Sequence, residues 1–345
     1  MVLDLKTDAG MAAFRGLLAE TDVFVTNVRR QSLESLGIEY EQIHADFPKL
    51  IYAHVTGWGR SDTSNTGTVE AENEAAFDIG SFYARSGMAM ALRVADDQPL
   101  SQWPGGIGDM VTSLATAQAI TAALFQRANS GKGQLVESSL LHTGLFTMGL
   151  SLQFAMMGQN SNDAIGWIPT RKTYECSDGV FYQMLGSGGS TRVQIPRLCE
   201  ALGLEDFLPL PEEMWTAPHD GAADLTAAIR ARFAELPSDT VAERFEELDV
   251  WATVVNSPEM VLDDSRPLET GAFFRPEGAD ASEERGNPFK NAELQLLRAP
   301  MNLGSSPFAT PDRAPFLGQH TEEVLHERLG YSAEQAAAAM GAKDK

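Results

Sequence analysis

Cysteine is scarce in this sequence: Cys176 and Cys199 are the only two among 345 residues. Neither belongs to a CxxC pair, and no histidine stands near them at the spacing of a zinc site, so we expect no metal. The alternative is a single disulfide between the two cysteines. Such a low number nevertheless favours two reduced thiols, and a cytoplasmic location is therefore predicted.

Long apolar runs are also missing. No stretch reaches the roughly 18 apolar residues of a membrane-spanning helix. Residues 1–10 lack the basic-then-apolar order of a signal peptide. We therefore expect no membrane partner. If a longer natural chain continues upstream of Met1, an organelle-targeting segment there is an alternative to the cytoplasmic location.

Positive charge is in short supply. Lysine and arginine number 26 against 48 aspartate and glutamate residues, which gives a net charge of −22. Such a surface repels nucleic acid, and no basic run offsets the repulsion locally. An anionic ligand would need a pocket that is positive against this background.

What the sequence does contain is an ordinary globular composition, with 43% apolar and 21% charged residues. Its length predicts about two domains. Near the N-terminus, helical patterns alternate with strand patterns. Helices are expected at 11–20, 32–37 and 39–46, and strands at 22–26 and 50–56. This alternation predicts an α/β protein with an open, doubly wound parallel sheet.

The middle of the chain is richer in helical patterns. Residues 75–91, 110–128 and 135–157 are each expected to form a helix, the last two long and apolar. Ser177-Asp178-Gly179 predicts a hairpin turn within 171–185, which opens a smaller α/β domain at 171–285. Its helices are expected at 193–202, 225–235 and 238–248, and the C-terminal helices at 321–329 and 333–340.

One carboxylate has unusual surroundings. Asp109 follows Gly105, Gly106 and Gly108 and stands where a long helix begins. The glycines let the backbone approach a ligand closely, and the helix N-terminus favours negative charge. An Asp in this place is also a common helix N-cap, so position alone does not make it a nucleophile.

The surrounding sequence is more specific. Residues 108–112 and 130–136, on either side of the long helix, resemble the signature of CoA-transferase family III. Further segments match in family order, at 2–7, 22–29, 50–59 and 314–322. The family includes formyl-CoA transferase, carnitine CoA-transferase and α-methylacyl-CoA racemase. The resemblance covers nearly the whole chain.

The resemblance implies a large domain formed by 1–158 and completed by 286–345, with the small domain at 171–285 nested before the C-terminal segment. It also implies an interlocked homodimer. The reaction would move CoA from an acyl-CoA thioester to a carboxylic acid through an aspartyl anhydride and an aspartyl thioester. CoA would be a substrate, and no cofactor would be needed.

Residue by residue, the resemblance makes Asp109 the nucleophile and Asp78 a second acidic group near it. It places CoA binding at Asn27, Val28, Arg29, Leu36, Gly57 and Gly108. Arg29 or Arg30 could pair with CoA phosphates. The plainer alternatives are two solvated arginines at a helix start and, for Asp78, a surface carboxylate.

Several positions depart from the family. The chain begins without the family's opening strand and glycine turn, so part of the CoA site is expected to be missing. Ser35 stands where arginine is common, and Ser113 replaces a glycine of the motif. Phe77 stands where racemases carry a histidine, which argues against racemisation because that chemistry needs a base on each face of the α-carbon. A racemase and a non-catalytic CoA-binding subunit remain the alternatives.

Overall fold

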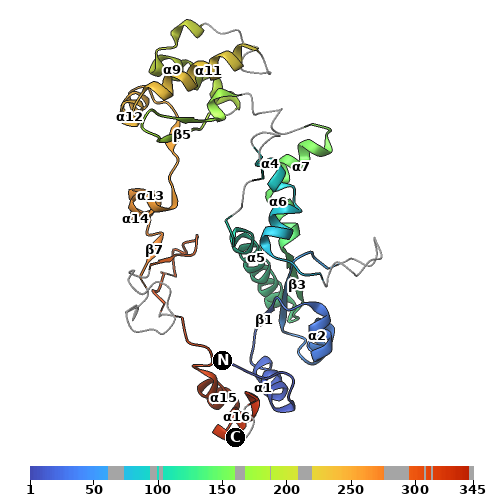
Figure 1. Cartoon of the computed structure of the whole chain (residues 1–345). Coiled ribbons are helices and arrows are strands. Elements are labelled where there is room, and N and C mark those ends of the chain that lie inside the picture. The colour runs from blue at the N-terminus through green and yellow to red at the C-terminus, as the bar shows by residue number, and fades with distance from the viewer. Residues whose placement is uncertain are drawn as a thin grey trace. The chain divides into compact units, whose positions relative to one another are not determined.

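The computed structural model describes residues 1–60, 74–93, 99–100, 104–159, 168–186, 188–208, 220–275, 295–306, 308–311 and 314–341. Contacts divide the chain into two compact units. The first unit joins Met1–Gly158 to Pro315–Lys345, and the second is Gln159–Ala314. Figure 1 shows the helices and strands of both units, which are described separately below.

A parallel sheet forms the centre of the first unit. Its strands are β1 (Val23–Thr26), β2 (Ile51–Thr56) and β3 (Leu135–Ser139), in the order β1-β2-β3. Val23 lies opposite Ile51, and Tyr52 lies opposite Leu135. β2 is flanked on both sides, so its first four residues are buried, as expected for a central strand. The predicted α/β class with a parallel sheet is confirmed.

The third strand corrects the sequence analysis, which placed a single helix at 135–157. Residues 135–139 instead form β3, and two short helices follow, α6 (Leu140–Thr147) and α7 (Gly149–Met156). Periodicity cannot separate a short apolar strand from a buried helical segment. Residues 135–139 form a strand rather than a helix because Val136 packs with Ile51 and Ala53 in one core cluster.

Three helices lie near the first two strands, and local chemistry sets their ends. They are α1 (Asp8–Leu18), α2 (Arg30–Leu36) and α3 (Tyr40–Asp46). The Thr7 hydroxyl accepts a hydrogen bond from the Gly10 N–H at the start of α1. Gly37 ends α2 in the left-handed conformation, and Glu39 forms a capping box with Gln42 at the start of α3.

The helix predicted at 75–91 is broken into two pieces. A π-helical segment, η2 (Ile79–Ala84), is followed by α4 (Met88–Ala91). Between them Gly87 takes a φ of +89°, which an α-helix cannot continue through. The prediction of one helix was therefore wrong, and the irregular π-helical turn begins next to Asp78.

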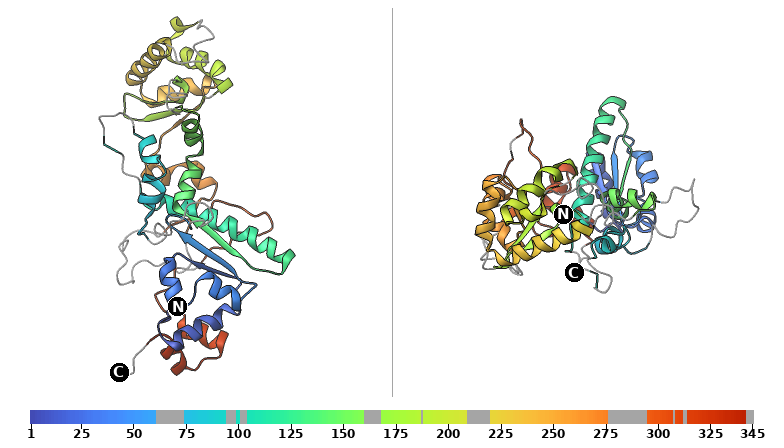
Figure 2. Two further views of the ribbon diagram at one scale, coloured as in Figure 1. Left: turned by 90° about the vertical axis from the view of Figure 1, so that its right-hand side faces the viewer. Right: turned by 90° about the horizontal axis from the view of Figure 1, so that it is seen from above.

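The long helix α5 (Ile107–Ser130) covers one face of the sheet, and Figure 2 shows it beside the strands. Its Ala123 is buried with Ile51 and Val136. At the opposite end of the chain, α15 (Thr321–Leu329) and α16 (Ala333–Ala339) pack against α1. Ala13 of α1 is fully buried in that contact, together with Leu325.

The second unit has its own core. An antiparallel sheet of β4 (Thr173–Glu175), β5 (Phe181–Met184) and β6 (Ala252–Val254) contains the predicted hairpin. The Tyr174 ring stacks on Phe233 at a centroid distance of 5.1 Å. The other elements are η3 (Pro169–Arg171), η4 (Gly188–Ser190), α9 (Thr191–Leu202), η5 (Glu205–Phe207), α11 (Asp220–Glu235), α12 (Ser238–Glu247), α13 (Pro258–Asp263), α14 (Ser265–Glu269), β7 (Phe273–Phe274) and β8 (Leu296–Leu297).

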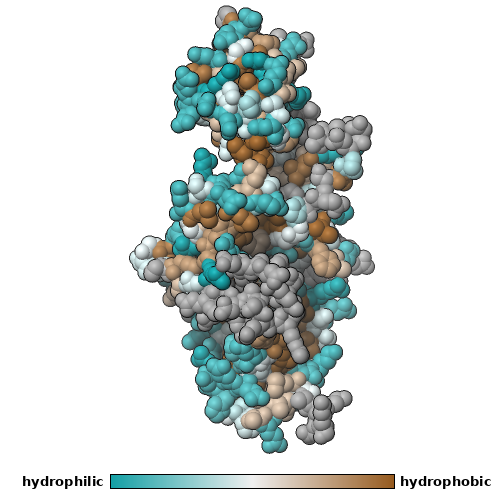
Figure 3. Space-filling model, turned by 60° about the vertical axis from the view of Figure 1, so that its left-hand side comes forward, coloured by the Kyte–Doolittle hydropathy of each residue, from teal (hydrophilic) through white to brown (hydrophobic). Residues whose placement is uncertain are grey.

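Large apolar side chains are exposed on helices of the first unit. Phe125 of α5 is 75% exposed, Phe146 of α6 is 88% exposed and Met156 of α7 is 78% exposed. Figure 3 shows hydrophobic surface among hydrophilic residues on one face of the molecule. Within the described ranges, no helix combines the length and apolar character needed to cross a bilayer.

Candidate active site

Two neighbouring hollows open where β1 and β2 end. The carboxyl ends of parallel strands lie at one edge of a sheet, which is where open α/β proteins bind ligands. Both hollows are lined by the turns that follow these strands and by part of the segment before η2. The lining residues that they share are Asn27, Val28, Val55, Thr56, Gly57, Ala76 and Phe77.

Different side chains distinguish the two hollows. The larger, with about 1430 Å³ of open space, contains Asp109 and is called the Asp109 hollow. The smaller, with about 700 Å³, contains Arg29, Arg30 and Arg60 and is called the arginine hollow. Because the hollows share walls, one extended ligand can place its charged end by the arginines and its other end by the carboxylate.

Asp109 is exposed in the first turn of α5. The sequence analysis began this helix at residue 110 and gave the helix cap as the alternative role of Asp109, but Gly106 is the cap and α5 begins at Ile107. Gly106 has a φ of +88°, a conformation that favours glycine, so the helix starts earlier than expected. Asp109 still lies near the unpaired N–H groups of the helix start, where negative charge is stabilised.

Asp78 is buried behind Asp109, with only 7% of its surface exposed. Its carboxylate accepts hydrogen bonds from the Ile79 N–H at 2.8 Å and from the Gly106 N–H at 2.6 Å. It therefore ties the start of α5 to the start of η2. Desolvation raises the pKa of Asp109, and the negative charge of Asp78 raises it further.

Glycine is required where these segments touch. A Cβ on Gly108 would lie 2.7 Å from the Phe82 Cβ and 2.8 Å from the Asp78 Cβ. A Cβ on Gly57 would lie 1.9 Å from the Ala76 Cβ. Both glycines thus permit close approach around Asp109, and Gly57 lines both hollows.

Asn27 and Val28 form the turn that separates the two hollows. The Thr26 hydroxyl accepts a hydrogen bond from the Val28 N–H at 3.2 Å. The His54 Nε2 lies 2.9 Å from the Val28 carbonyl oxygen and donates to it in the matching tautomer. The turn is therefore held from β1 and β2, with the Asn27 side chain exposed.

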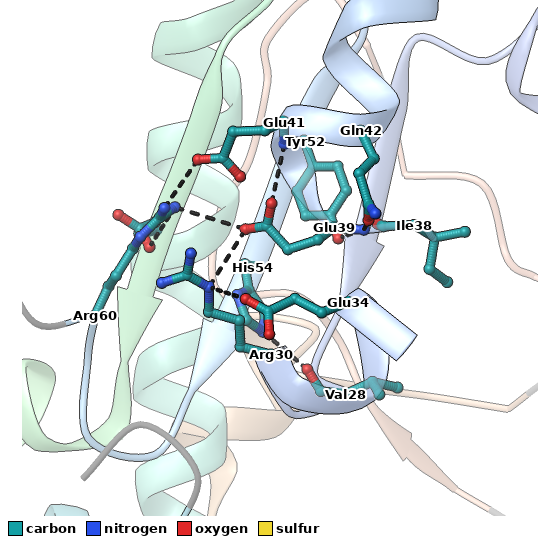
Figure 4. Close-up of polar contacts among 11 residues, drawn as sticks. Val28, Arg30, Glu34, Ile38, Glu39, Glu41, Gln42, Tyr52, His54 and Arg60 are labelled. Atoms are coloured by element: carbon teal, nitrogen blue, oxygen red, sulfur yellow. Dashed lines mark hydrogen bonds and ion pairs between the residues drawn. The ribbon is translucent and has the colours of Figure 1, made fainter. Parts of the chain in front are cut away.

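The three arginines of the arginine hollow differ in their partners, and Figure 4 shows those of Arg30 and Arg60. The Arg30 Nε lies 3.1 Å from a Glu34 oxygen and 3.6 Å from a Glu39 oxygen. Arg29 is exposed beside it, and no described residue forms an ion pair with its guanidinium. Of the two arginines that the family resemblance proposed for phosphate, Arg29 is thus the one that no carboxylate of the described residues engages.

Arg60 and Glu39 were missed by the sequence analysis. The buried Glu39 lies 3.8 Å from Arg60, which also bonds Glu41 at 2.9 Å. Partial burial acts to raise the pKa of Glu41, but the Arg60 hydrogen bond, a backbone hydrogen bond and the charges of Arg60 and Arg30 together outweigh it, and the pKa is lowered. The sequence analysis placed Glu39 only at the start of the helix expected at 39–46; its pairing with arginines 9 and 21 positions away has no local signal.

Leu36 does not line either hollow. It packs against the core cluster that includes Leu33 and Ile38. A contact between its side chain and CoA therefore has no support from this geometry. Among the described residues, no group of histidine, cysteine and acidic side chains is arranged to hold a metal ion.

The fold and this site define an α/β protein with a carboxylate at the ligand-binding edge of a parallel sheet. The sequence pattern of CoA-transferase family III matches residues 1–321. The chain belongs to CoA-transferase family III.

Characterised relatives fall into two activity groups. The (R)-2-hydroxy-4-methylpentanoate CoA-transferase of Clostridioides difficile is 28% identical, over 96% of this chain and 79% of its own. The human alpha-methylacyl-CoA racemase is 30% identical, over 97% of this chain and 81% of its own.

Solved structures share the fold. A CAIB/BAIF family protein of Brucella suis superposes with a TM-score of 0.72 at 24% identity, over 94% of this chain and 80% of its own. A hypothetical protein of Mycobacterium tuberculosis gives 0.73 at 18% identity, over 93% of this chain and 81% of its own.

Proposed function

We propose that this chain transfers CoA between an acyl-CoA thioester and a carboxylic acid, with Asp109 as the nucleophile. One observation carries the proposal: an exposed carboxylate stands in a hollow that adjoins an arginine-lined hollow at the ligand-binding edge of the sheet. The family membership and the relatives named as CoA-transferases support it.

The first half of the reaction moves CoA onto the protein. An Asp109 oxygen attacks the thioester carbonyl carbon and the C–S bond breaks. CoA leaves as a thiolate, and Asp109 and the acyl group are now joined in a mixed anhydride. The thiolate then attacks the Asp109 carbonyl carbon of the anhydride. The first acid departs as a carboxylate and leaves an aspartyl-CoA thioester. Two easier acyl transfers replace one difficult exchange.

The second half reverses these steps with another acid. Its carboxylate attacks the aspartyl thioester, and CoA thiolate leaves again. The thiolate attacks the new acyl carbon of the anhydride, which releases the new acyl-CoA and frees the Asp109 carboxylate. No proton is gained or lost in the overall reaction, so no proton donor or acceptor is required. N–H groups at the start of α5 would stabilise the negative oxygens that form on the way.

CoA would lie across the turn at Asn27 and Val28. Arg29 would bind a phosphate group because it lines the arginine hollow and forms no ion pair with a described residue. Gly57 and Gly108 would let the pantetheine arm and the thioester approach the backbone. Glu39, Glu74 and Glu137 also line this hollow and balance its three arginines, so Arg29 would supply the attraction for an anionic ligand.

A racemase activity is the second candidate, because one of the relatives is a racemase. Racemisation needs a proton donor or acceptor on each face of the substrate carbon. The side chain that faces the Asp109 hollow at position 77 is Phe77, which is 74% exposed and cannot transfer a proton. This favours the transferase.

Mass spectrometry of CoA exchange tests the proposal. Purified protein is mixed with an acyl-CoA and a ¹³C-labelled acid, and labelled acyl-CoA is measured over time. Hydroxylamine should trap CoA-loaded Asp109 as a hydroxamate in the wild type. Asp109→Ala should remain folded by circular dichroism and lose exchange. Full exchange by Asp109→Ala would refute the proposed nucleophile.

Incubation in heavy water separates the two candidates. A transferase should leave the α-hydrogen of a 2-methylacyl-CoA in place when no acid is added. Rapid α-deuteration under those conditions would favour the racemase. Binding of CoA with neither exchange nor deuteration would favour a non-catalytic CoA-binding subunit.

A further inference from the structure

Two buried side chains hold the turn after β1 on both sides of Val28. The Thr26 hydroxyl accepts a hydrogen bond from the Val28 N–H at 3.2 Å. The His54 Nε2 lies 2.9 Å from the Val28 carbonyl oxygen (Figure 4). Thr26 and His54 are each 8% exposed and lie opposite each other in the register of β1 and β2. One residue of the turn is therefore clamped by a matched pair of side chains from neighbouring strands.

The carbonyl that His54 holds belongs to the peptide bond between Val28 and Arg29. This bond is planar, so a hydrogen bond to the Val28 oxygen fixes the direction in which the chain enters Arg29. On the other side, the Arg29 carbonyl oxygen accepts from the N–H groups of Ser32 and Leu33, at 2.9 and 3.1 Å. The Arg29 backbone is thus held from both directions, by His54 and by the first turn of α2.

Arg29 itself is exposed and lines the arginine hollow. No described residue forms an ion pair with it, whereas Arg30 and Arg60 have carboxylate partners. Ordering a long side chain on binding costs free energy, and the cost is lower when the backbone that carries it is already fixed. Arg29 therefore combines a fixed backbone with a guanidinium that can bind an anionic group.

We infer that His54 is a positioning residue for CoA: it holds the Val28 carbonyl through its Nε2–H and so directs Arg29 at a CoA phosphate. The inference rests on the proposed binding of CoA phosphate by Arg29. His54 also lines the arginine hollow, so direct contact with the ligand is the rival explanation. The two differ in one respect: a residue that acts through Arg29 has no effect once Arg29 is absent.

Calorimetric titration with CoA tests the role of the His54 hydrogen bond. The amide of His54→Asn ends one carbon short of the Nε2 position, whereas the amide nitrogen of His54→Gln can take that place and donate. We expect His54→Asn to weaken CoA binding about tenfold and His54→Gln to stay within about threefold of the wild type.

His326→Leu is the matched control. The His326 Nδ1 also lies near a backbone carbonyl oxygen, that of Tyr331, at 3.1 Å, but His326 lines neither hollow. Loss of this contact should leave CoA affinity within about twofold of the wild type. Circular dichroism checks that every variant is folded.

A double-mutant cycle separates positioning from direct contact. Arg29→Ala should weaken CoA binding about tenfold or more. In that background His54→Asn should add less than about twofold, because the arginine that it positions is gone. In transfer assays His54→Asn should raise KM for the acyl-CoA about tenfold and leave kcat within about twofold. Should His54→Asn fail to fold, His54→Leu takes its place in the cycle.

The outcomes separate this inference from the proposed function. Unchanged CoA affinity in His54→Asn or in Arg29→Ala overturns the inference. An equal loss in His54→Gln, or losses that add in the double variant, also overturns it, since these indicate direct contact or a general structural effect. None of these results touches transfer through Asp109, which exchange by the wild type measures separately. The expected binding pattern without any exchange contradicts the proposed transfer alone, and a wild type that does not bind CoA contradicts both.

Discussion

At the scale of single residues, the carboxyl pair Asp78 and Asp109 dominates the site. One is buried and holds two backbone N–H groups, while the other is exposed to the hollow. Like charges close together make the second ionisation harder. Desolvation, together with the charge of Asp78, raises the pKa of Asp109, and its more basic carboxylate is a better nucleophile once it is ionised.

The pH dependence of transfer follows from this pair. Activity should rise with pH as Asp109 ionises, along an acid limb above the usual pKa range of aspartate. Asp78→Asn removes the negative charge that raises the pKa of Asp109, so the acid limb of kcat/KM should move to lower pH.

The comparison is made between pH profiles of the two proteins with one acyl-CoA and one acid. The plateau rate should also fall in Asp78→Asn, because an amide nitrogen cannot accept the Gly106 hydrogen bond. An acid limb that stays in place or moves upward would show that Asp78 does not control the ionisation of Asp109.

At the scale of elements, the site depends on how closely α5 meets η2. Gly108→Ala would force a methyl group against Phe82 and Asp78, and we expect a loss of about 1–3 kcal/mol in the free energy of unfolding, with reduced transfer. Gly105→Ala is the control, since nothing lies within 4 Å of its added Cβ. Chemical denaturation of both variants measures the difference; equal stability would contradict the tight contact.

Glu39 joins α3 to the turns after β1 and β2. Glu39→Ala removes a helix cap, worth about 1 kcal/mol, and leaves Arg30 and Arg60 without a shared carboxylate, so we expect a total loss of about 1–3 kcal/mol. Glu41→Ala, at an exposed position that also pairs with Arg60, should cost less than about 1 kcal/mol. Thermal unfolding compares the two, and a larger effect from Glu41→Ala would refute this role.

Elements with chemical signals at their ends were predictable from the sequence. Gly37 stands at the end of the helix predicted at 32–37 and Gly179 in the predicted hairpin turn, and the structure agrees at both. β3 was not predictable, because its strand identity comes from pairing with β2 across about 80 residues of chain. The break at Gly87 and the early start of α5 at Gly106 depend on backbone angles that a glycine permits but does not require.

The site was predictable only in part, for a similar reason. The motif indicated Asp109, and the segments after the two predicted strands indicated Asn27 and Gly57, which the structure places around one hollow. Their roles stay predictions. Leu36 was assigned by position in a motif, but it faces the core. The Arg60 contacts require β2, α3 and β3 to come together, which local sequence does not encode.

At the scale of the whole molecule, the exposed apolar side chains of α5, α6 and α7 need a partner surface. Monomeric proteins seldom leave such side chains in contact with water as a group. We propose a homodimer in which these helices are covered, in keeping with the interlocked dimer that the family resemblance implies. The protein should then elute at about twice 37.4 kDa.

Phe146→Glu tests this assembly, because the Phe146 side chain is 88% exposed and its loss leaves no cavity. A charge buried in the interface should shift the protein toward monomer by light scattering and lower the transfer rate. Glu323→Ala, at an exposed position of α15, is the control. A wild-type monomer, or a dimer that Phe146→Glu leaves intact, would refute the proposal.

The packing of α1 against α15 and α16 has a consequence for synthesis. The first unit joins residues at both ends of the sequence, and Ala13 is covered only when Leu325 is in place. A ribosome adding 5–20 residues per second needs roughly 8 to 30 seconds to make the intervening segment of about 160 residues. During that time the parallel sheet has been made, but one of its helices has an uncovered apolar face. The second unit is complete in sequence before the first, so it is free to fold first although it is synthesised second.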